Sequence, residues 1–360
     1  MEGHAVVAEV TLRDVAHAAG CSVATVSRVL AGTRPVGAET ARAVREAADR
    51  LGYRPNEVAR ALRSRCTGTV GLVLPQITNP FFPSLVRELE HVLHAEGRAV
   101  LLADCDDDPE TEAARIAALL GRRVDALLLI PVDERRSRDA VAAAAAQVPL
   151  VLLDRGCGPG VADSVAVDNA AGMALVLDHL AATGRRRPCF IGAAGTASAA
   201  VERRTAYAAG AAALDPAAPA RTVLGDFSVE WGRAAVDRIW PARPDAVICA
   251  NDLIAAGALQ RLRQLGADVP GEVAVTGFDD IPLAGLADPA LTTVRQPVAE
   301  LAAEAARLLA RRPATAPVPG PRRPVRTVRL APELVVRVSS AVGGARGEHV
   351  RPLDRTRSEH

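Results

Sequence analysis

The sequence predicts an α/β protein with a small three-helix domain at its N terminus and a larger body built on parallel β-sheets. Two observations indicate this architecture. Residues 11–55 show short helical patterns separated by turn residues, whereas beyond residue 66 apolar runs alternate with helical stretches. The length fits both parts, because 360 residues are too many for one ordinary domain but enough for a small domain followed by a large one.

The N-terminal patterns are those of a helix-turn-helix, preceded by an arm of residues 1–10. The first helix ends at Gly20, and Ser22 stands where an N-cap would open a second helix over residues 23–30. A third helix is expected over residues 39–51, with Gly52 as its stop. Four apolar residues at helical spacing define the first helix: Leu12, Val15, Ala16 and Ala19.

A helix-turn-helix places its second helix in the major groove of DNA. In this chain Arg28 is a candidate for contact with a base edge or a phosphate, and Val23 and Ala24 are candidates for contact with thymine methyl groups. The alternative for Val23 is burial in the core of the domain. The predicted DNA contacts of this domain are Thr11, Ser22, Val23, Ala24, Thr25, Ser27 and Arg28.

Charge is distributed unevenly along the chain. Residues 11–66 hold ten arginines and five acidic residues, a local balance of +5, which leaves −4 for the remainder because the formal net charge of the whole chain is +1. Positive charge is therefore concentrated where a phosphate backbone would bind, although the net charge alone predicts no nucleic-acid partner. All 43 basic residues are arginine, which we attribute to genome composition bias.

The body carries seven apolar runs that we predict to be strands, separated by helical patterns. Nearly continuous apolar strands that alternate with helices predict doubly wound parallel sheets with both faces covered. Ligands of such sheets bind at the carboxyl ends of the strands, so the residues directly after the strands are candidates for a binding site. The seven runs are residues 70–74, 99–103, 126–130, 150–153, 189–192, 246–249 and 273–277.

Polar and aromatic residues stand at or near several of these strand ends. Carboxylate and guanidinium groups form hydrogen bonds with hydroxyl or ring-nitrogen groups, and an aromatic face stacks on a sugar or a base. Two structural alternatives stay open: Phe81 or Phe82 packs under the following helix, and Asp252 caps the helix that follows its strand. The candidate ligand contacts are Phe81, Phe82, Asp154, Arg203, Phe227, Asn251 and Asp279.

Several segments, in a fixed order, resemble the lactose/galactose repressor family of bacterial transcription factors. The resemblance covers about residues 10–340 and is carried by TLRDVAHAAGCSVATVSRVLAG, RLGYRPNEVARALRS, GLVLPQITNPFF, CANDLIAAGAL, VTGFDD, LTTVRQP and ELVVR. It implies a two-lobed body of the periplasmic-binding-protein type over residues 67–340, with an effector cleft between the lobes. The chain is then expected to cross between the lobes near residues 168, 296 and 325. The family places effector contacts at the positions of Arg203, Phe227 and Asp279.

The chain departs from the family pattern in three places. Ala206 stands where the family has a glycine, Cys21 replaces a common valine, and the Pro-rich segment RRPATAPVPGPRRP interrupts the region of the third crossing. We expect this segment, which includes residues 313–324, to be a surface loop. Residues 341–360 are polar and are expected to form a disordered tail.

Residues 56–66 resemble the hinge helix of the family, which folds only on DNA and inserts a leucine into the minor groove. Leu62 is that leucine by its motif position, and the resemblance adds Asn56, Ala59 and Arg60 as DNA contacts. Such a wedge costs about a few kcal/mol of base unstacking, which the contacts with bent DNA offset. Two hinges must lie close together to form, so closure of the lobes around an effector can separate them and release DNA.

We therefore expect a transcriptional repressor whose affinity for a pseudo-palindromic operator is controlled by a small-molecule effector, a sugar or a related metabolite. A homodimer is expected, because a two-fold operator needs two heads and the tail has no heptads for a tetramerising helix. Co-repressor-dependent or activating regulation of the same family stays open. No cofactor, metal or membrane partner is expected.

Other classes of protein fit the sequence less well. A cytosolic two-lobed sugar-binding protein without a regulatory role would share the body but would not need residues 11–66. A nucleotide-dependent oxidoreductase needs a glycine-rich turn after its first strand, and LVLPQITNPFF offers none. Neither a Ser-His-Asp arrangement nor paired carboxylates emerge, so we expect a protein that is not an enzyme.

The cellular location is expected to be the cytoplasm, with association with the nucleoid when DNA is bound. The six cysteines show no metal-ligand spacing, which predicts reduced structural thiols. The N-terminal residues MEGHAVVAEV lack the pattern of a signal peptide, and no apolar run reaches membrane-spanning length.

Overall fold

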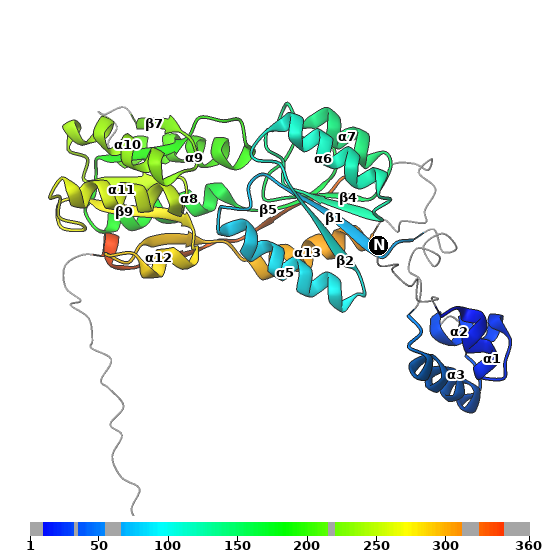
Figure 1. Cartoon of the computed structure of the whole chain (residues 1–360). Coiled ribbons are helices and arrows are strands. Elements are labelled where there is room, and N and C mark those ends of the chain that lie inside the picture. Colours follow the sequence, from blue (N-terminus) through cyan, green and yellow to red (C-terminus); the bar gives the residue numbers. More distant parts are fainter. Residues whose placement is uncertain (1–9, 32–34, 55–65, 215–219, 312–323, 342–360) are drawn as a thin grey trace, which may run out of the picture. The chain divides into compact units, whose positions relative to one another are not determined.

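Contacts along the chain divide it into two units, residues 1–67 and residues 68–360, which we call the head and the body (Figure 1). The computed structural model describes residues 10–31, 35–54, 66–214, 220–311 and 324–341. Within these ranges no helix is long and apolar enough to cross a membrane.

Three helices form the head, as the sequence predicts. The Ser22 hydroxyl accepts a hydrogen bond of 3.2 Å from the backbone N–H of Thr25, which caps the second helix. Gly52 ends the third helix with a φ of 64°, a conformation that glycine adopts without strain. Each helix contributes one fully buried valine to the core, namely Val15, Val26 and Val44. The helices are α1 (Leu12–Ala18), α2 (Val23–Ala31) and α3 (Ala38–Leu51).

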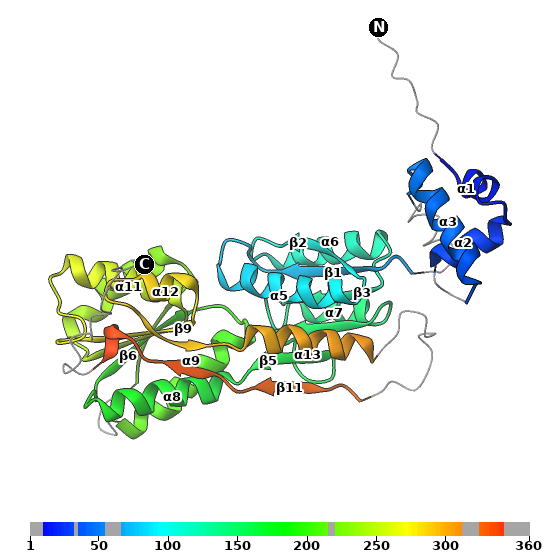
Figure 2. The same ribbon diagram turned by 90° about the horizontal axis from the view of Figure 1, so that it is seen from below.

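The first lobe of the body is a six-stranded parallel sheet with the strand order β11-β5-β4-β3-β1-β2. Helices α5 (Phe81–Ala95) and α13 (Val298–Ala310) cover one face, and α6 (Pro109–Gly121) and α7 (Arg138–Ala145) cover the other (Figure 1). Figure 2 views the lobe from the side of α5 and α13. Its strands are β1 (Thr69–Leu74), β2 (Ala99–Asp104), β3 (Ala126–Leu129), β4 (Leu150–Leu153), β5 (Asp163–Val167) and β11 (Thr327–Leu330).

The second lobe is a six-stranded sheet with the order β12-β10-β9-β8-β6-β7, in which β12 alone among the described strands runs antiparallel to its neighbour. Helices α8 (Asn169–Ala182) and α9 (Ser198–Leu214) pack together, as do α10 (Val229–Ile239) and α11 (Asp252–Gln264). The short helix α12 (Pro282–Leu286) follows β9. The strands are β6 (Pro188–Ala193), β7 (Arg221–Gly225), β8 (Ala246–Cys249), β9 (Ala274–Asp279), β10 (Thr292–Arg295) and β12 (Glu333–Val335).

The chain passes between the two lobes at three places. The first passage lies between β5 and α8, at residue 168, and the second lies between β10 and α13, at residues 296–297. The third lies between β11 and β12, at residues 331–332, and not near residue 325 as expected. The predicted position of the third passage was too early in the chain, because residues 327–330 pair with β5 along their whole length and so belong to the first sheet.

Five strands escaped the sequence prediction: β5, β7, β10, β11 and β12. Three of them, β7, β11 and β12, are edge strands whose partly exposed side chains break up any apolar run. β5 and β10 are short and contain Asp, Ser, Thr or Arg residues. β2 was predicted although it is an edge strand, because it carries leucines at Leu101 and Leu102 that the structure leaves exposed.

Candidate functional site

The outer face of helix α2 carries most of the predicted DNA contacts. Val26 and Val29 are buried on the opposite face and hold the helix against the core of the head. Val23 is 41% exposed, so its alternative placement in the core was wrong. On the outer face Ser22, Val23, Ala24 and Arg28 are exposed, and Thr25 and Ser27 are half-buried.

Thr11 precedes α1 and is exposed. Its hydroxyl and its backbone N–H donate hydrogen bonds of 2.7 and 2.8 Å to the carboxylate of Asp14. These bonds, the side-chain one first, hold the pKa of Asp14 below its usual range. Thr11 therefore has a structural role at the start of the helix. The other predicted contacts, Asn56, Ala59, Arg60 and Leu62, lie outside the described residues.

Arg203 is the centre of a buried polar cluster in the body. It extends from α9 and is 3% exposed. Its Nε donates a hydrogen bond of 2.8 Å to Asn169 Oδ1, and its Nη1 donates one of 2.8 Å to the carbonyl oxygen of Ala250. Its guanidinium carbon lies 3.6 Å from the ring centroid of Phe278. These contacts fix the direction of the guanidinium group.

Asp279, the last residue of β9, is the acidic partner of Arg203. Its Oδ1 lies 3.4 Å from Arg203 Nη1 and accepts a hydrogen bond of 2.8 Å from Gln296 Nε2. Burial raises the pKa of Asp279 to about 6, against the opposing effects of Arg203 and Gln296. The carboxyl group therefore changes its charge close to neutral pH.

Two aspartates of the cluster have backbone conformations that side chains disfavour. Asp154, directly after β4, has a φ of 59°, and Asp279 has a φ of 105°. Such residues cost about 1–3 kcal/mol each and concentrate at binding sites, where the surrounding structure holds them in place. Both stand at the carboxyl ends of parallel strands, one in each lobe, where α/β sheets bind ligands.

Arg155 of the first lobe stands between aromatic rings of both lobes. Its guanidinium carbon lies 5.7 Å from the ring centroid of Phe82 in the first lobe and 5.7 Å from that of Phe227 in the second. Its Nε is 3.7 Å from Asp154 Oδ2. Burial raises the pKa of Asp154, and the charge of Arg155 opposes that shift. The two predicted phenylalanines therefore face one cation across the boundary between the lobes.

Three polar atoms of this cluster are buried without a hydrogen-bond partner among the described residues. They are two acceptors, Asp154 Oδ1 and Gln296 Oε1, and one donor, Arg155 Nε. Buried polar atoms in folded proteins are nearly always paired, so unpaired ones mark places where a bound molecule or water completes the bonding.

Asn251 and Asp252 both have structural roles at the junction of β8 and α11. Asn251 Oδ1 accepts a hydrogen bond of 2.9 Å from the backbone N–H of Ile254, so Asn251, and not Asp252, caps α11. Asp252 accepts bonds of 2.8 Å from Ile281 N–H and 2.6 Å from Thr293 Oγ1. Burial raises the pKa of Asp252 well above its usual value. Both side chains thus tie β8 and α11 to their neighbours.

Phe81 is separate from the cluster. It is 3% exposed and packs in the core under α5, where its ring meets that of Phe82 edge-to-face at 5.4 Å. The structural alternative thus holds for Phe81, whereas Phe82 packs in the same core and also faces Arg155. Asn169 and Gln296 were missed by the sequence prediction. A signal was available, because each polar side chain stands beside an expected lobe crossing.

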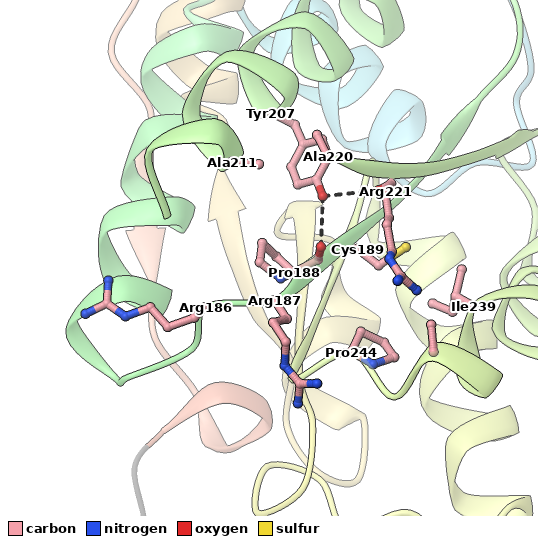
Figure 3. Close-up of a pocket in the computed structure, with 11 residues that line it drawn as sticks. Arg186, Arg187, Pro188, Cys189, Tyr207, Ala211, Ala220, Arg221, Ile239 and Pro244 are labelled. Atoms are coloured by element: carbon pink, nitrogen blue, oxygen red, sulfur yellow. Dashed lines mark hydrogen bonds between the residues drawn. The ribbon is translucent and has the colours of Figure 1, made fainter. Parts of the chain in front are cut away.

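A pocket of about 100 Å³ lies elsewhere in the second lobe, at the amino ends of β6, β7 and β8 (Figure 3). Among its lining residues, Tyr207 donates its hydroxyl to the carbonyl oxygens of Pro188 and Arg221 at 3.0 and 3.1 Å. The pocket is smaller than usual ligand sites, which have volumes of roughly 300–1,000 Å³. It also lies at the opposite ends of the strands from the polar cluster. We therefore do not assign the effector to it.

The cysteines and acidic residues form no metal-binding group of three or more within the described part of the chain. The six cysteines, all of them in the described part of the chain, form no disulfide with one another. Burial raises the pKa of Cys105 and Cys157 to about 12 and that of Cys189 to about 11, which leaves these thiols protonated and unreactive at neutral pH.

Comparison with known families defines the class of the protein. Residues 11–56 match the bacterial regulatory proteins of the lacI family, and residues 177–340 match the periplasmic binding protein-like domain. A helix-turn-helix head joined to a body of this kind defines a DNA-binding transcriptional regulator, not an enzyme.

Proteins that are similar to this chain over most of its length identify its family. The ribose operon repressor of Halalkalibacterium halodurans is 34% identical over 306 residues, which cover 83% of this chain and 89% of that protein. The crystal structure of the lac repressor dimer bound to operator and the anti-inducer ONPF is similar with a TM-score of 0.79 and 25% identity over 92% of this chain and 99% of that one. The transcriptional regulator CelR–cellobiose complex is similar with a TM-score of 0.66 and 31% identity over 92% and 100%. The chain belongs to the lacI family of bacterial regulatory proteins.

Proposed function

We propose that this chain is a repressor whose affinity for operator DNA is controlled by a small polyhydroxylated effector, a sugar or a related metabolite, bound between the two lobes. The observation that carries this proposal is the buried cluster to which both lobes contribute. Two acceptors and one donor of that cluster, on Asp154, Gln296 and Arg155, have no partner among the described residues. Vicinal hydroxyl groups, each of which donates and accepts, match such a set.

The ring of the proposed effector would lie against aromatic side chains. Phe82 and Phe227, one from each lobe, flank the space that Arg155 occupies. An apolar ring face stacks on phenylalanine, while carboxylates and guanidinium groups select the hydroxyl pattern at its edge. The cellobiose complex of the similar regulator CelR supports a sugar as the ligand class.

For the head, we propose that α2 reads the major groove with its exposed outer face, through Ser22, Ala24 and Arg28, with Val23 on thymine methyl groups. Leu62, in the proposed hinge, would wedge into the minor groove. We also propose that the protein acts in the cytoplasm and associates with the nucleoid when it is bound to its operator.

The proposed assembly is a homodimer. The edge strand β2 exposes Leu101 and Leu102 by 36% and 41%, and α12 exposes Leu283 and Leu286 by 48% and 80%. An edge strand with exposed apolar residues is a template for association with another chain. The lac repressor, which this chain resembles, is a dimer on its operator. Light scattering at micromolar concentration should give twice the mass of one chain; a monomer or a tetramer would contradict the assignment.

One experiment tests the proposed function as a whole. The full chain selects its operator from random DNA fragments, and the complex is then titrated with pentoses, hexoses and disaccharides, including D-ribose and cellobiose, while fluorescence anisotropy reports bound DNA. Release of the operator by one sugar identifies an inducer, and tighter binding identifies a co-repressor. If no sugar changes operator binding, the effector class is wrong, and if no fragment is selected, the DNA-binding role is wrong.

A further inference from the structure

Six polar side chains of the body form one unbroken chain of hydrogen bonds that starts in the candidate effector site and ends at its edge. Gln296 and Arg203 both donate to Asp279, and Arg203 donates to Asn169. Asn169 Nδ2 donates to Glu202 Oε2 at 2.8 Å. Beyond it, Arg329 Nη1 and Nη2 donate to the two Glu202 carboxylate oxygens at 2.9 and 2.6 Å.

This chain of bonds has one member at each of the three passages between the lobes. Asn169 directly follows the first passage, Gln296 lies in the second, and Arg329 precedes the third at the end of β11. Arg329 Nη1 also donates to the carbonyl oxygen of Val167 at 3.2 Å, and Asp168 N–H donates to the carbonyl oxygen of Leu330 at 2.8 Å. The first and third passages are thus bonded to each other as well as to the cluster.

The last link of the chain joins the two lobes. Arg329 belongs to the first sheet, whereas Glu202 lies on α9 of the second lobe, directly before Arg203. The two side chains are 41% and 30% exposed, and ion pairs with that exposure stabilise a fold little. The bidentate geometry does fix direction, because both carboxylate oxygens are engaged by one planar group. A rotation of the lobes that moves α9 relative to β11 changes the geometry of this pair.

We propose that Glu202 and Arg329 are positioning residues for the effector response. Their ion pair fixes the positions of Asn169 and Arg203 relative to the third passage. An effector that displaces Arg203 or Asp279 then changes the bonding at Arg329 and with it the angle between the lobes. The inference rests on the proposed function. It assigns coupling to a pair that itself need not touch the effector.

The test uses the full chain and its selected operator. Glu202→Gln, Arg329→Gln and the double variant are compared with matched controls, Glu272→Gln and Arg243→Gln, whose ion pair of 2.7 Å lies within the second lobe. The readout is the ratio of operator dissociation constants with and without D-ribose or cellobiose, beside the free energy of unfolding in urea. Each single variant should move this ratio toward one by about two- to thirtyfold, with no further change in the double variant. The controls should keep the wild-type ratio.

Arg329→Lys separates charge from geometry. It keeps the positive charge but loses the bidentate fork, so an intermediate ratio is expected. If the Glu202 and Arg329 variants respond to sugar like the wild type while their stability falls like that of the controls, the pair is merely structural and the inference is wrong.

The result remains decisive if the wild-type chain responds to neither sugar. In that case these two sugars are excluded as effectors, and the pair is judged on operator affinity alone. A shared change of at least about twofold in both single variants, without further change in the double variant, supports the coupling role. Unchanged operator affinity overturns it.

Discussion

The exposed outer face of α2, which we propose to contact DNA, and the buried polar cluster of the body each rely on an arginine, but under opposite conditions. On that face, Arg28 and Ser22 are exposed to solvent. In the cluster, Arg203 and Asp279 are 3% and 7% exposed and depend on each other for charge compensation. The proposed DNA contacts can therefore change independently of folding, whereas the proposed effector contacts are also part of the fold.

The largest effect should follow from breaking the buried pair. Arg203→Ala leaves the Asp279 carboxylate buried with one partner fewer, and removal of one member of such a pair costs about 3–5 kcal/mol of folding free energy. Urea unfolding of the body should show this loss. Operator titrations should show that Arg203→Ala and Asp279→Ala still bind DNA but no longer answer the effector. A wild-type response in both variants would remove them from the effector site.

The second prediction concerns the exposed counterpart, Arg28. Arg28→Ala should weaken the specific operator by about 1–3 kcal/mol and relax base preference at one position of each half-site. Because the side chain is exposed, urea unfolding of the variant should agree with that of the wild type within about 0.5 kcal/mol. Equal weakening on every DNA sequence would instead make Arg28 a phosphate contact.

The third prediction separates Leu62 from its charged neighbour. Leu62→Ala removes no charge, so nonspecific binding and its salt dependence should persist while DNA bending and operator preference fall together. Arg60→Ala should mainly lower the salt slope by about one unit. Two measurements on Leu62→Ala decide the case: the DNA bend angle from gel mobility, and the melting temperature of the protein without DNA. A lower melting temperature with an unchanged bend angle would mean that Leu62 packs against the rest of the protein.

The smallest effect is a pH dependence that the head should not share. Burial raises the pKa of Asp279 to about 6, so its carboxylate is present above that pH and lost below it. An effector hydroxyl that donates to Asp279 should therefore bind more weakly as pH falls from 7 to 5, and Asp279→Asn should flatten the profile. Since the pKa is higher in the folded chain than in the unfolded one, the wild type should gain stability relative to Asp279→Asn over the same fall in pH. A pH-independent difference would place the titrating group elsewhere.

Local signals predicted the parts of this molecule that depend on neighbouring residues in the sequence. Gly20, Ser22 and Gly52 punctuate the head, and continuous apolar runs mark the central strands of the body. Edge strands such as β7 and β12 gave no such signal, since their residues are exposed or only partly buried. The role of Asp252 was misjudged for a similar reason, because its partners Ile281 and Thr293 lie far along the chain.

The sequence predicted those parts of the candidate site that stand at or near the ends of predicted strands. Four predicted residues, Asp154, Arg203, Phe227 and Asp279, gather at one cluster with Phe82. The links through Glu202 and Arg329 join residues 127 positions apart and follow no local pattern. Only the pairing of β11 with β5 brings that arginine beside α9.

Because the chain passes between the lobes three times, the two lobes are completed in a fixed order as the chain leaves the ribosome. Helix α13 buries Leu301 and Leu308 in the core of the first lobe, and β11 completes the sheet of that lobe, yet both emerge after nearly all of the second lobe. The second lobe lacks only the edge strand β12 when residue 296 has been translated. The lobe that is translated first is therefore the last to close its core, and its apolar face stays open to aggregation until residue 330 has emerged.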